Sequence, residues 1–457
     1  MAEKNKPSAW RFLWTSEDIR QKLLITLGIL LIFRVAANIP APGVDRAALE
    51  AFLQQSRSGN FLDFLNLLSG GTISNFSLLS MGVYPYITAQ IILQLLVPII
   101  PALQKRMEDN PREGRQWMEK WTYYLAVPMA MLSAIGQINI FNSIASQTII
   151  PFGFTPDLWL SSLTTLLVMT AGTMFAIWLG ELISEYGIRG QGLSLIIFAG
   201  IVSQIPQNIQ VILLDQTYRW ILLGIMIFVI IATVVAVVYV QQGRRNVPIM
   251  FAQKAQVFQA IQRGRTIKTP QPFLPLLVNL SGMIPLIFAS AILQFPAIVA
   301  SYFVTSETQW VANFSTSVVN FFNASGANSW GYWSLYFLMV VSFTYFYTTV
   351  IFDQQNYGDN LKRQRIQIPG VPEGAPTQKY LSRIQSRITL PGALLLGVVA
   401  IMPFLIQVVY PPASNNAGLF LVSSSGLLIV VGVVRDTVAN IESELKNRYE
   451  DIKLLTS

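Results

Sequence analysis

The chain has 457 residues, of which 53% are hydrophobic and 12% are charged, and its net charge is +8. An ordinary soluble domain has about 25% charged residues, so a water-soluble fold of this composition would expose too much apolar surface. The sequence contains no cysteine and no histidine. Their absence excludes disulfides, thiolate nucleophiles and Ser–His catalytic pairs, and it argues against most structural zinc sites.

Long apolar segments recur along the chain, and a membrane-spanning helix needs about 20 apolar residues. The predicted spans are Leu23–Pro40, Phe76–Ile100, Trp121–Phe141, Leu158–Gly180, Leu193–Ile205, Trp220–Val240, Pro275–Phe303, Gly331–Phe352, Ile388–Tyr410 and Gly418–Val434. No small-residue cleavage site follows the first span, so we expect it to be an uncleaved anchor.

The positions of the basic residues predict how these spans are oriented. With ten spans and a cytoplasmic N-terminus, only Arg46, Arg57 and Arg219 lie outside, and Arg34 lies near the end of the first span. Cytoplasmic loops carry an excess of Lys and Arg. The sequence therefore predicts an all-α membrane protein with ten transmembrane helices and both termini in the cytoplasm.

The fifth segment, Leu193–Ile205, is short enough to be a re-entrant piece. If it did not cross, the basic loops at 241–268 and 353–387 would both lie outside, against the positive-inside rule. We therefore expect it to cross. The first five and last five spans then have opposite orientations, as in inverted repeats.

The predicted organisation follows from these spans. The segments are a cytoplasmic N-terminal segment (1–22), a first half with the first five spans (23–206), the sixth span with the outer loop before it (207–240), a basic cytoplasmic loop (241–268), the seventh and eighth spans (269–352), a second cytoplasmic loop (353–387), the ninth and tenth spans (388–434) and a cytoplasmic tail (435–457).

A short apolar stretch, Phe61–Leu68, precedes Ser69-Gly70-Gly71 between the first two spans. It is too short to span and is interpreted as a half-helix that enters from the outside. Irregular backbone at membrane depth requires protein or a water-filled cavity around it. An amphipathic helix at the interface is the alternative.

The span centres contain almost no ionisable groups. Glu181, Glu185 and Arg189 lie at or beyond the cytoplasmic end of the fourth span, and no Asp or Glu is placed mid-span. Ion-coupled transporters normally carry such groups. The pattern therefore favours a passive conduit, whose energy comes from something outside this chain. It also argues against a membrane enzyme. A solute transporter remains the second hypothesis, with only uncharged polar residues such as Asn279 for a substrate.

The first cytoplasmic loop is strongly basic and has no acidic residue. It contains Arg244, Arg245, Lys254, Arg263, Arg265 and Lys268. Such a loop attracts nucleic-acid phosphates or an acidic protein surface; a topology signal with anionic-lipid contact is the alternative. In the second loop, the Pro369–Gly374 run predicts a tight turn.

Several long motifs occur in one order over essentially the whole chain. They are Ile39–Asp45, Asn66–Leu96, Gly172–Ile188, Ser194–Pro206, Val278–Pro296, Asp359–Gly374 and Leu427–Leu445. Together they resemble the SecY family, the channel subunit of the Sec protein translocon. The resemblance implies two inverted five-helix halves around a central pore. It also implies a channel, not an enzyme, that moves unfolded polypeptides across the plasma membrane and transmembrane segments laterally into it.

The resemblance also assigns roles to residues. It implies an apolar pore ring of Val83, Ile87, Ile197, Ile287 and Ile429. It implies a plug at 61–75 that includes Phe61, Phe64, Leu65, Leu68, Ser69, Gly70 and Gly71. It implies a lateral gate between the second and third spans and the seventh and eighth, with Thr88, Ser133 and Asn279 as its polar residues, which we expect to form a hydrogen-bonded seam. The alternative is that Asn279 lies near the cytoplasmic end of its helix and bonds only to water or backbone. Taken singly, each ring residue could equally be an ordinary core or lipid-facing aliphatic.

The same resemblance implies partners. The basic loops, with Lys362 and Arg363 in the second, would bind the ribosome (rRNA and ribosomal proteins) and the SecA motor ATPase in turn. A SecE-like small subunit, a SecG-like subunit, signal sequences, nascent chains and membrane lipids are further expected partners, in a bacterial plasma membrane and with no cofactor. The family usually has an Arg where this chain has Pro372, so we expect the first loop to contribute more than the second.

Overall fold

The computed structural model describes most of the chain. The described residues are 17–45, 48–49, 76–144, 148–153, 155–156, 158–214, 219–251, 272–282, 284–301, 303–304, 308–322, 329–409 and 429–441. The plug segment at 61–75 lies outside them. So do Lys254, Arg263, Arg265 and Lys268 of the first basic loop.

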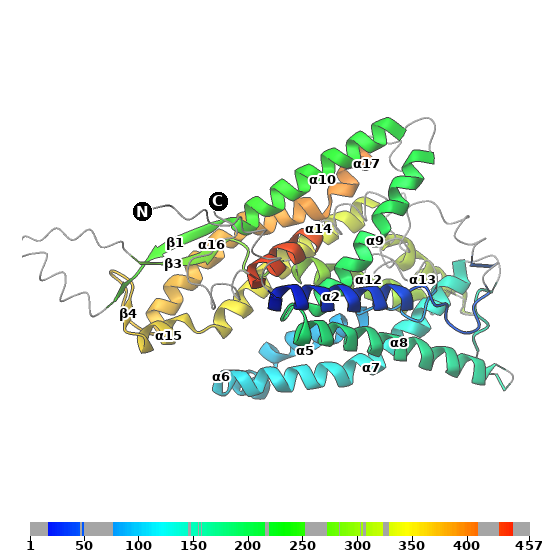
Figure 1. Ribbon diagram of the computed structural model, residues 1–457, viewed down its shortest axis with the longest axis horizontal. Coiled ribbons are helices and arrows are strands. Elements are labelled where there is room, and N and C mark those ends of the chain that lie inside the picture. The colour runs from blue at the N-terminus through cyan, green and yellow to red at the C-terminus, as the bar shows by residue number, and fades with distance from the viewer. Residues whose placement is uncertain are drawn as a thin grey trace, which may run out of the picture.

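The N-terminal half is helical. Its helices are α2 (Glu17–Ala36), α5 (Tyr84–Ile99), α6 (Pro101–Asp109), α7 (Pro111–Ile144), α8 (Trp159–Tyr186) and α9 (Gly192–Leu214). Helix α5 packs against α7, α7 against α8, and α2 against both α8 and α9. The long helices of both halves run roughly along the long axis of the molecule (Figure 1).

The C-terminal half repeats this helical character. Its helices are α10 (Arg219–Gln242), α12 (Ile284–Ser301), α13 (Gln309–Phe321), α14 (Ser329–Gln354), α15 (Tyr357–Arg363), α16 (Ala375–Ala400) and α17 (Met402–Val409). Residues 429–441 are also helical. Helix α14 packs along α16 and against α12, and α10 packs against α16.

Two small antiparallel sheets join the predicted cytoplasmic loops. Strand β1 (Arg244–Pro248) pairs with β3 (Phe273–Leu277), and β2 (Met250–Phe251) pairs with β4 (Ile366–Gln367). The second pairing links the first loop to the second. An apolar cluster that includes Val247, Ile249, Leu276, Leu361 and Leu381 lies beneath the strands and α15. Both loops therefore form one folded unit, here called the loop module (residues 243–251, 272–278 and 355–384), which lies at one end of the molecule (Figure 1).

Some of the described helices can cross a membrane on length and composition alone. They are Trp159–Tyr186, Arg219–Gln242 and Trp330–Arg363, and a fourth span results if Tyr84–Val97 and Pro101–Met107, bent by 99°, count as one. Helix α9 has 23 residues and is longer than the predicted fifth segment, but its apolar part, Gly192–Ser203, is shorter than a membrane span.

Large apolar side chains cover much of the outer surface. On α2, Leu24, Leu27, Leu31 and Val35 are each about 60% exposed and repeat at helical spacing. Exposed apolar stripes of this kind on long helices indicate contact with lipid or with another apolar helix.

Several predicted segment limits were wrong. The predicted span Pro275–Phe303 begins as strand β3, and its helix starts only at Ile284. Helix α16 starts at Ala375, before the predicted span limit Ile388, because the same helix also forms part of the loop module. The predicted span Phe76–Ile100 is helical only from Tyr84.

Candidate pore, gate and cytoplasmic surface

The residues that the sequence assigned to the pore ring lie in one hydrophobic cluster. Val83, Ile197 and Ile429 are at most 7% exposed, and Ile87 and Ile287 are partly buried against the same cluster. These residues come from the start of α5, from α9, from α12 and from the helix at 429–441. The cluster therefore draws its side chains from both halves of the molecule.

A non-helical segment, Phe76–Val83, positions the first of these residues. Its backbone bonds to the end of the first span: Ala41 N–H donates to the Phe76 carbonyl at 2.9 Å, and Leu78 N–H donates to the Ile39 carbonyl at 2.9 Å. The segment packs against α8 at Gly172, where a Cβ atom would overlap the carbonyl oxygen of Leu78. Glycine is thus needed at position 172 for the backbone to pass close enough to place Val83.

Two aromatic residues that sequence reasoning missed belong to the cluster. Phe288 on α12 and Tyr347 on α14 are buried and meet edge to face with ring centroids 5.4 Å apart. A signal for Tyr347 exists in the sequence, because Val340, Thr344 and Tyr347 repeat at helical spacing and are all buried. The apolar side chains of such a cluster can exclude ions and water without binding a peptide tightly.

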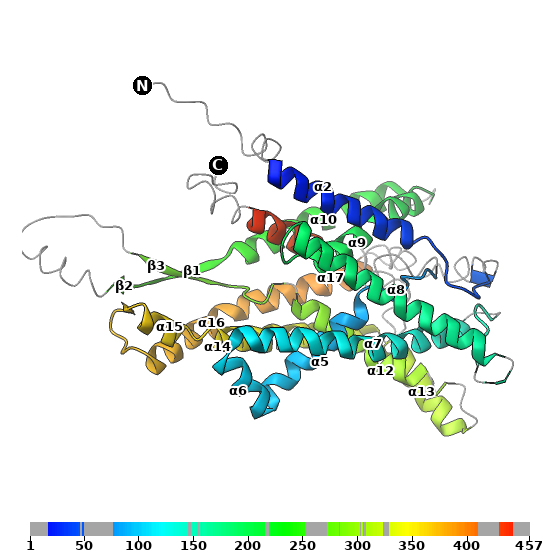
Figure 2. The same ribbon diagram turned by 60° about the horizontal axis from the view of Figure 1, so that its bottom comes forward.

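Besides the shared cluster, helix-to-helix contacts join the two halves in the described part of the chain. Helix α12 packs against α7 and α5, and α9 packs against α10. Figure 2 shows α12 beside α5 and α7. Contact on one side through α12 and on the other through α9 and α10 is the arrangement of two halves that meet around a central cluster.

The polar residues assigned to the gate do not bond to one another as expected. Asn279 is 2% exposed, but it lies in the turn before α12. Its side-chain amide donates to the Gly282 carbonyl at 2.9 Å and its oxygen accepts the Ser281 hydroxyl at 3.0 Å. Thr88 donates to the Pro85 carbonyl in its own helix. The expected seam with Ser133 is therefore wrong for Asn279, because the turn at Gly282 (φ +63°) supplies a nearer acceptor.

The described basic residues of the two loops are exposed on the loop module. Arg244 and Arg245 are neighbours on β1, and Lys362 and Arg363 lie in the last turn of α15. The strand pairing of β2 with β4 brings the two loops to the same end of the molecule. The predicted turn at 369–374 is present, with Gly370 and Gly374 at positive φ.

The last described helix, residues 429–441, bonds to both halves. Arg435 donates to the Gln241 carbonyl at the end of α10 at 3.5 Å, and Asn440 donates to the Arg189 carbonyl after α8 at 3.2 Å. Beyond the predicted tenth span, burial raises the pKa of Asp436 and the adjacent Arg435 opposes that shift. The helix thus connects the end of α10 in one half with the end of α8 in the other.

Within the described residues no three His, Cys, Asp or Glu side chains gather as they would around a metal ion.

The comparisons with known proteins agree with this architecture. The sequence model of the SecY family matches residues 77–438. The chain is 36% identical over 444 residues to the protein translocase subunit SecY of Streptomyces scabiei, with 95% of this chain and 96% of that protein covered. It is also 36% identical over 442 residues to the same subunit of Bacillus subtilis (strain 168), with 94% and 95% covered.

Solved structures of channels have the same fold. A protein-conducting channel matches with a TM-score of 0.61 and 17% sequence identity over 95% of both chains. Sec61 in a canine ribosome-channel complex from the endoplasmic reticulum matches with a TM-score of 0.59 over the same share of each chain. These matches support the channel hypothesis and give no support to the solute-transporter alternative. The chain, with its ten-helix channel fold, belongs to the SecY family of protein translocase subunits.

Proposed function

We propose that this chain conducts unfolded polypeptides across the membrane and that Val83, Ile87, Ile197, Ile287 and Ile429 form its constriction. The observation that carries the proposal is their gathering, from separate helices of both halves, in one apolar cluster. An apolar constriction sheds water when it is empty, so it blocks ions, and it offers a passing chain no strong binding site.

The same helices supply a lateral exit. In this proposal the halves part where α12 meets α5 and α7, and they remain in contact where α9 meets α10. Thr88 and Asn279 bond within their own halves, so no hydrogen bond of theirs has to break when the gate opens. A hydrophobic signal segment can then replace helix–helix packing with packing of its own.

The loop module is the proposed docking surface for the ribosome and for a motor ATPase. Arg244, Arg245, Lys362 and Arg363 place positive charge on this one exposed unit. The module faces the cytoplasm in this proposal, together with both termini. A SecE-like helix and a SecG-like subunit are the proposed partners for the exposed apolar faces of the outer helices, including the stripe on α2.

The constriction is tested by ion conductance in planar bilayers. The double variant Ile197→Ser/Ile287→Ser introduces hydroxyls into the ring and should raise the resting conductance above that of the unchanged channel, because a polar ring stays wet. The matched control is Ile227→Ser/Ile231→Ser, which makes the same chemical change at outward-facing positions that are 52% and 57% exposed. Equal conductance in the two double variants would contradict the proposed constriction.

A further inference from the structure

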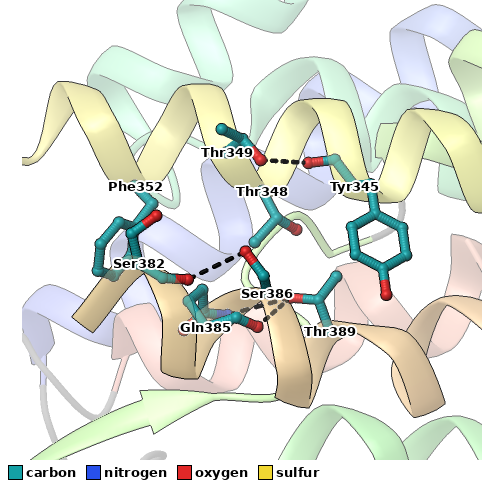
Figure 3. Close-up of a pocket in the computed structure, with 8 residues that line it drawn as sticks. All are labelled: Tyr345, Thr348, Thr349, Phe352, Ser382, Gln385, Ser386 and Thr389. Carbon is teal, nitrogen blue, oxygen red and sulfur yellow. Dashed lines mark hydrogen bonds between the residues drawn. The ribbon is translucent and has the colours of Figure 1, made fainter. Parts of the chain in front are cut away.

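A small polar pocket lies between α14 and α16, away from the proposed pore. Its free volume is about 10 Å³, which is room for one oxygen-sized group. Figure 3 shows Thr348 and Thr349 on α14 opposite Gln385, Ser386 and Thr389 on α16. Two membrane helices that pack along each other thus enclose a hydroxyl- and amide-lined space where apolar side chains would be the ordinary choice.

Two buried polar atoms of this pocket have no partner among the described residues. Thr348 is 3% exposed and Gln385 is 2% exposed, yet the Thr348 hydroxyl and the Gln385 Oε1 atom make no hydrogen bond. The other end of the Gln385 amide is fixed, because it donates to the Leu277 carbonyl at 2.9 Å and to Thr389 Oγ1 at 3.4 Å. Leaving buried polar atoms unpaired costs free energy. A hydroxyl-sized ligand that donates to Gln385 Oε1 and forms a hydrogen bond with the Thr348 hydroxyl would satisfy both atoms.

The exposed face of α16 shows the depth of the pocket in the membrane. Leu390, Leu394 and Val398 form an exposed apolar stripe, and one turn earlier the same stripe continues as exposed Arg383 and Arg387. The change from leucine to arginine marks the level of the lipid headgroups.

The pocket residues lie at this same level. Ser382, Gln385, Ser386 and Thr389 are interleaved with the two arginines along α16. On α14 the acidic Asp353 follows the pocket residue Phe352, so the arginines outnumber the nearby acid.

We propose that this is a binding site for an anionic phospholipid whose headgroup carries a free hydroxyl, such as phosphatidylglycerol. Arg383 and Arg387 hold the phosphate, the acyl chains follow the stripe from Leu390 to Val398, and a headgroup hydroxyl enters the pocket. That hydroxyl donates to Gln385 Oε1 and bonds to the Thr348 hydroxyl. Since Gln385 also holds the end of β3 through Leu277, the lipid contacts the residue that fastens the loop module to α16.

Native mass spectrometry of the purified protein tests the site. The protein is equilibrated with phosphatidylglycerol or with phosphatidylmethanol, which has the same charge but no headgroup hydroxyl. Each of the two hydrogen bonds of the headgroup hydroxyl should favour retention of phosphatidylglycerol over phosphatidylmethanol roughly threefold to tenfold, the range for a neutral hydrogen bond. Thr348→Val keeps the shape of the side chain, and Gln385→Leu removes the acceptor; each should lower the preference, and the double variant should abolish it, while retention of both lipids continues.

Charge variants separate this site from a general attraction for anions. Arg383→Gln/Arg387→Gln should lower retention of both lipids. Lys120→Gln, an exposed basic residue of α7 beside the exposed Trp121, is the charge-changing control and should leave the preference intact. Soluble glycerol 3-phosphate should fail to displace the lipid, because it lacks acyl chains. The proposal would be overturned if the unchanged protein showed no preference for phosphatidylglycerol over phosphatidylmethanol, or if Thr348→Val and Gln385→Leu kept the same preference. The pocket would then be assigned to a water molecule.

Discussion

At the scale of single residues, glycines set how closely the backbone segments of the first half approach. A Cβ at Gly172 would overlap the Leu78 carbonyl, and a Cβ at Gly192 would overlap the Gly180 carbonyl. The first contact fixes the segment that carries Val83, and the second fixes α9 against α8. The geometry of the central cluster therefore depends on positions that lie outside the cluster.

The variant Gly172→Ala should be strongly destabilised. The added methyl group meets backbone and cannot be accommodated by a side-chain rotation, so we expect a loss of about 3 kcal/mol or more. The control is Gly224→Ala on α10, where a Cβ would have nothing within 4 Å and where alanine favours the helix by up to about 1 kcal/mol. Thermal unfolding of both variants in detergent, followed by tryptophan fluorescence, gives the comparison; a melting temperature of Gly172→Ala at or above that of Gly224→Ala would refute the steric argument.

Sequence reasoning identified residues better than it identified their bonding partners. The pore-ring residues were named from motif positions, and the structure places them in one cluster; their role as a constriction stays a prediction. The partner of Asn279 was not predictable, because it depends on the φ angle of Gly282 and on where α12 begins. The buried pair Thr348 and Gln385 was also missed, because Gln385 falls in the predicted second cytoplasmic loop and its burial depends on how α14 and α16 pack.

At the scale of elements, the order of the described helices follows the order of the predicted spans, but their limits near the loop module differ from the prediction. Apolar runs predict where a helix crosses lipid, but α16 begins at Ala375, several turns before the apolar run that predicted its span. The strands β1 to β4 were not predicted, because short pairings such as Met250 with Gln367 bring together residues that are far apart in the sequence. The loop module is the outcome of that long-range pairing.

The loop module gives a prediction about ribosome binding. Arg244→Gln/Arg245→Gln removes two exposed charges from β1 and should weaken binding, and the remaining affinity should fall less steeply with ionic strength, because exposed charges are screened by salt. Lys362→Gln/Arg363→Gln should have a smaller effect. The measurement is co-sedimentation of the reconstituted protein with ribosomes over a series of salt concentrations.

The control for this experiment makes the same charge change on α7. Arg112 and Arg115 are exposed on that helix and lie outside the loop module, so Arg112→Gln/Arg115→Gln should bind as the unchanged protein does. A loss of binding that is equal in all three double variants would point to net charge and count against a specific surface on β1.

At the scale of the whole molecule, the two halves meet at one apolar cluster, and the helix at 429–441 joins the end of α10 to the end of α8. Helix 429–441 contributes Ile429 to the cluster, and it bonds through Arg435 and Asn440 to the ends of α10 and α8. In the proposed function the halves separate where α12 packs against α5 and α7, while the helix at 429–441 keeps them connected through its bonds to α10 and α8. The proposed function then has a polypeptide cross the molecule through this cluster.

The most direct test of this account uses cysteines, because the chain has none of its own. A secretory protein with one cysteine is arrested in mid-passage through channels that carry a single substitution, Ile87→Cys, Ile197→Cys or Ile287→Cys. Ile231→Cys, which faces outward, is the control. Under mild oxidation the three ring variants should form a disulfide with the arrested chain and the control should not. Cross-linking that is absent at all three ring positions, or equally strong at Ile231→Cys, would contradict passage of the polypeptide through the cluster.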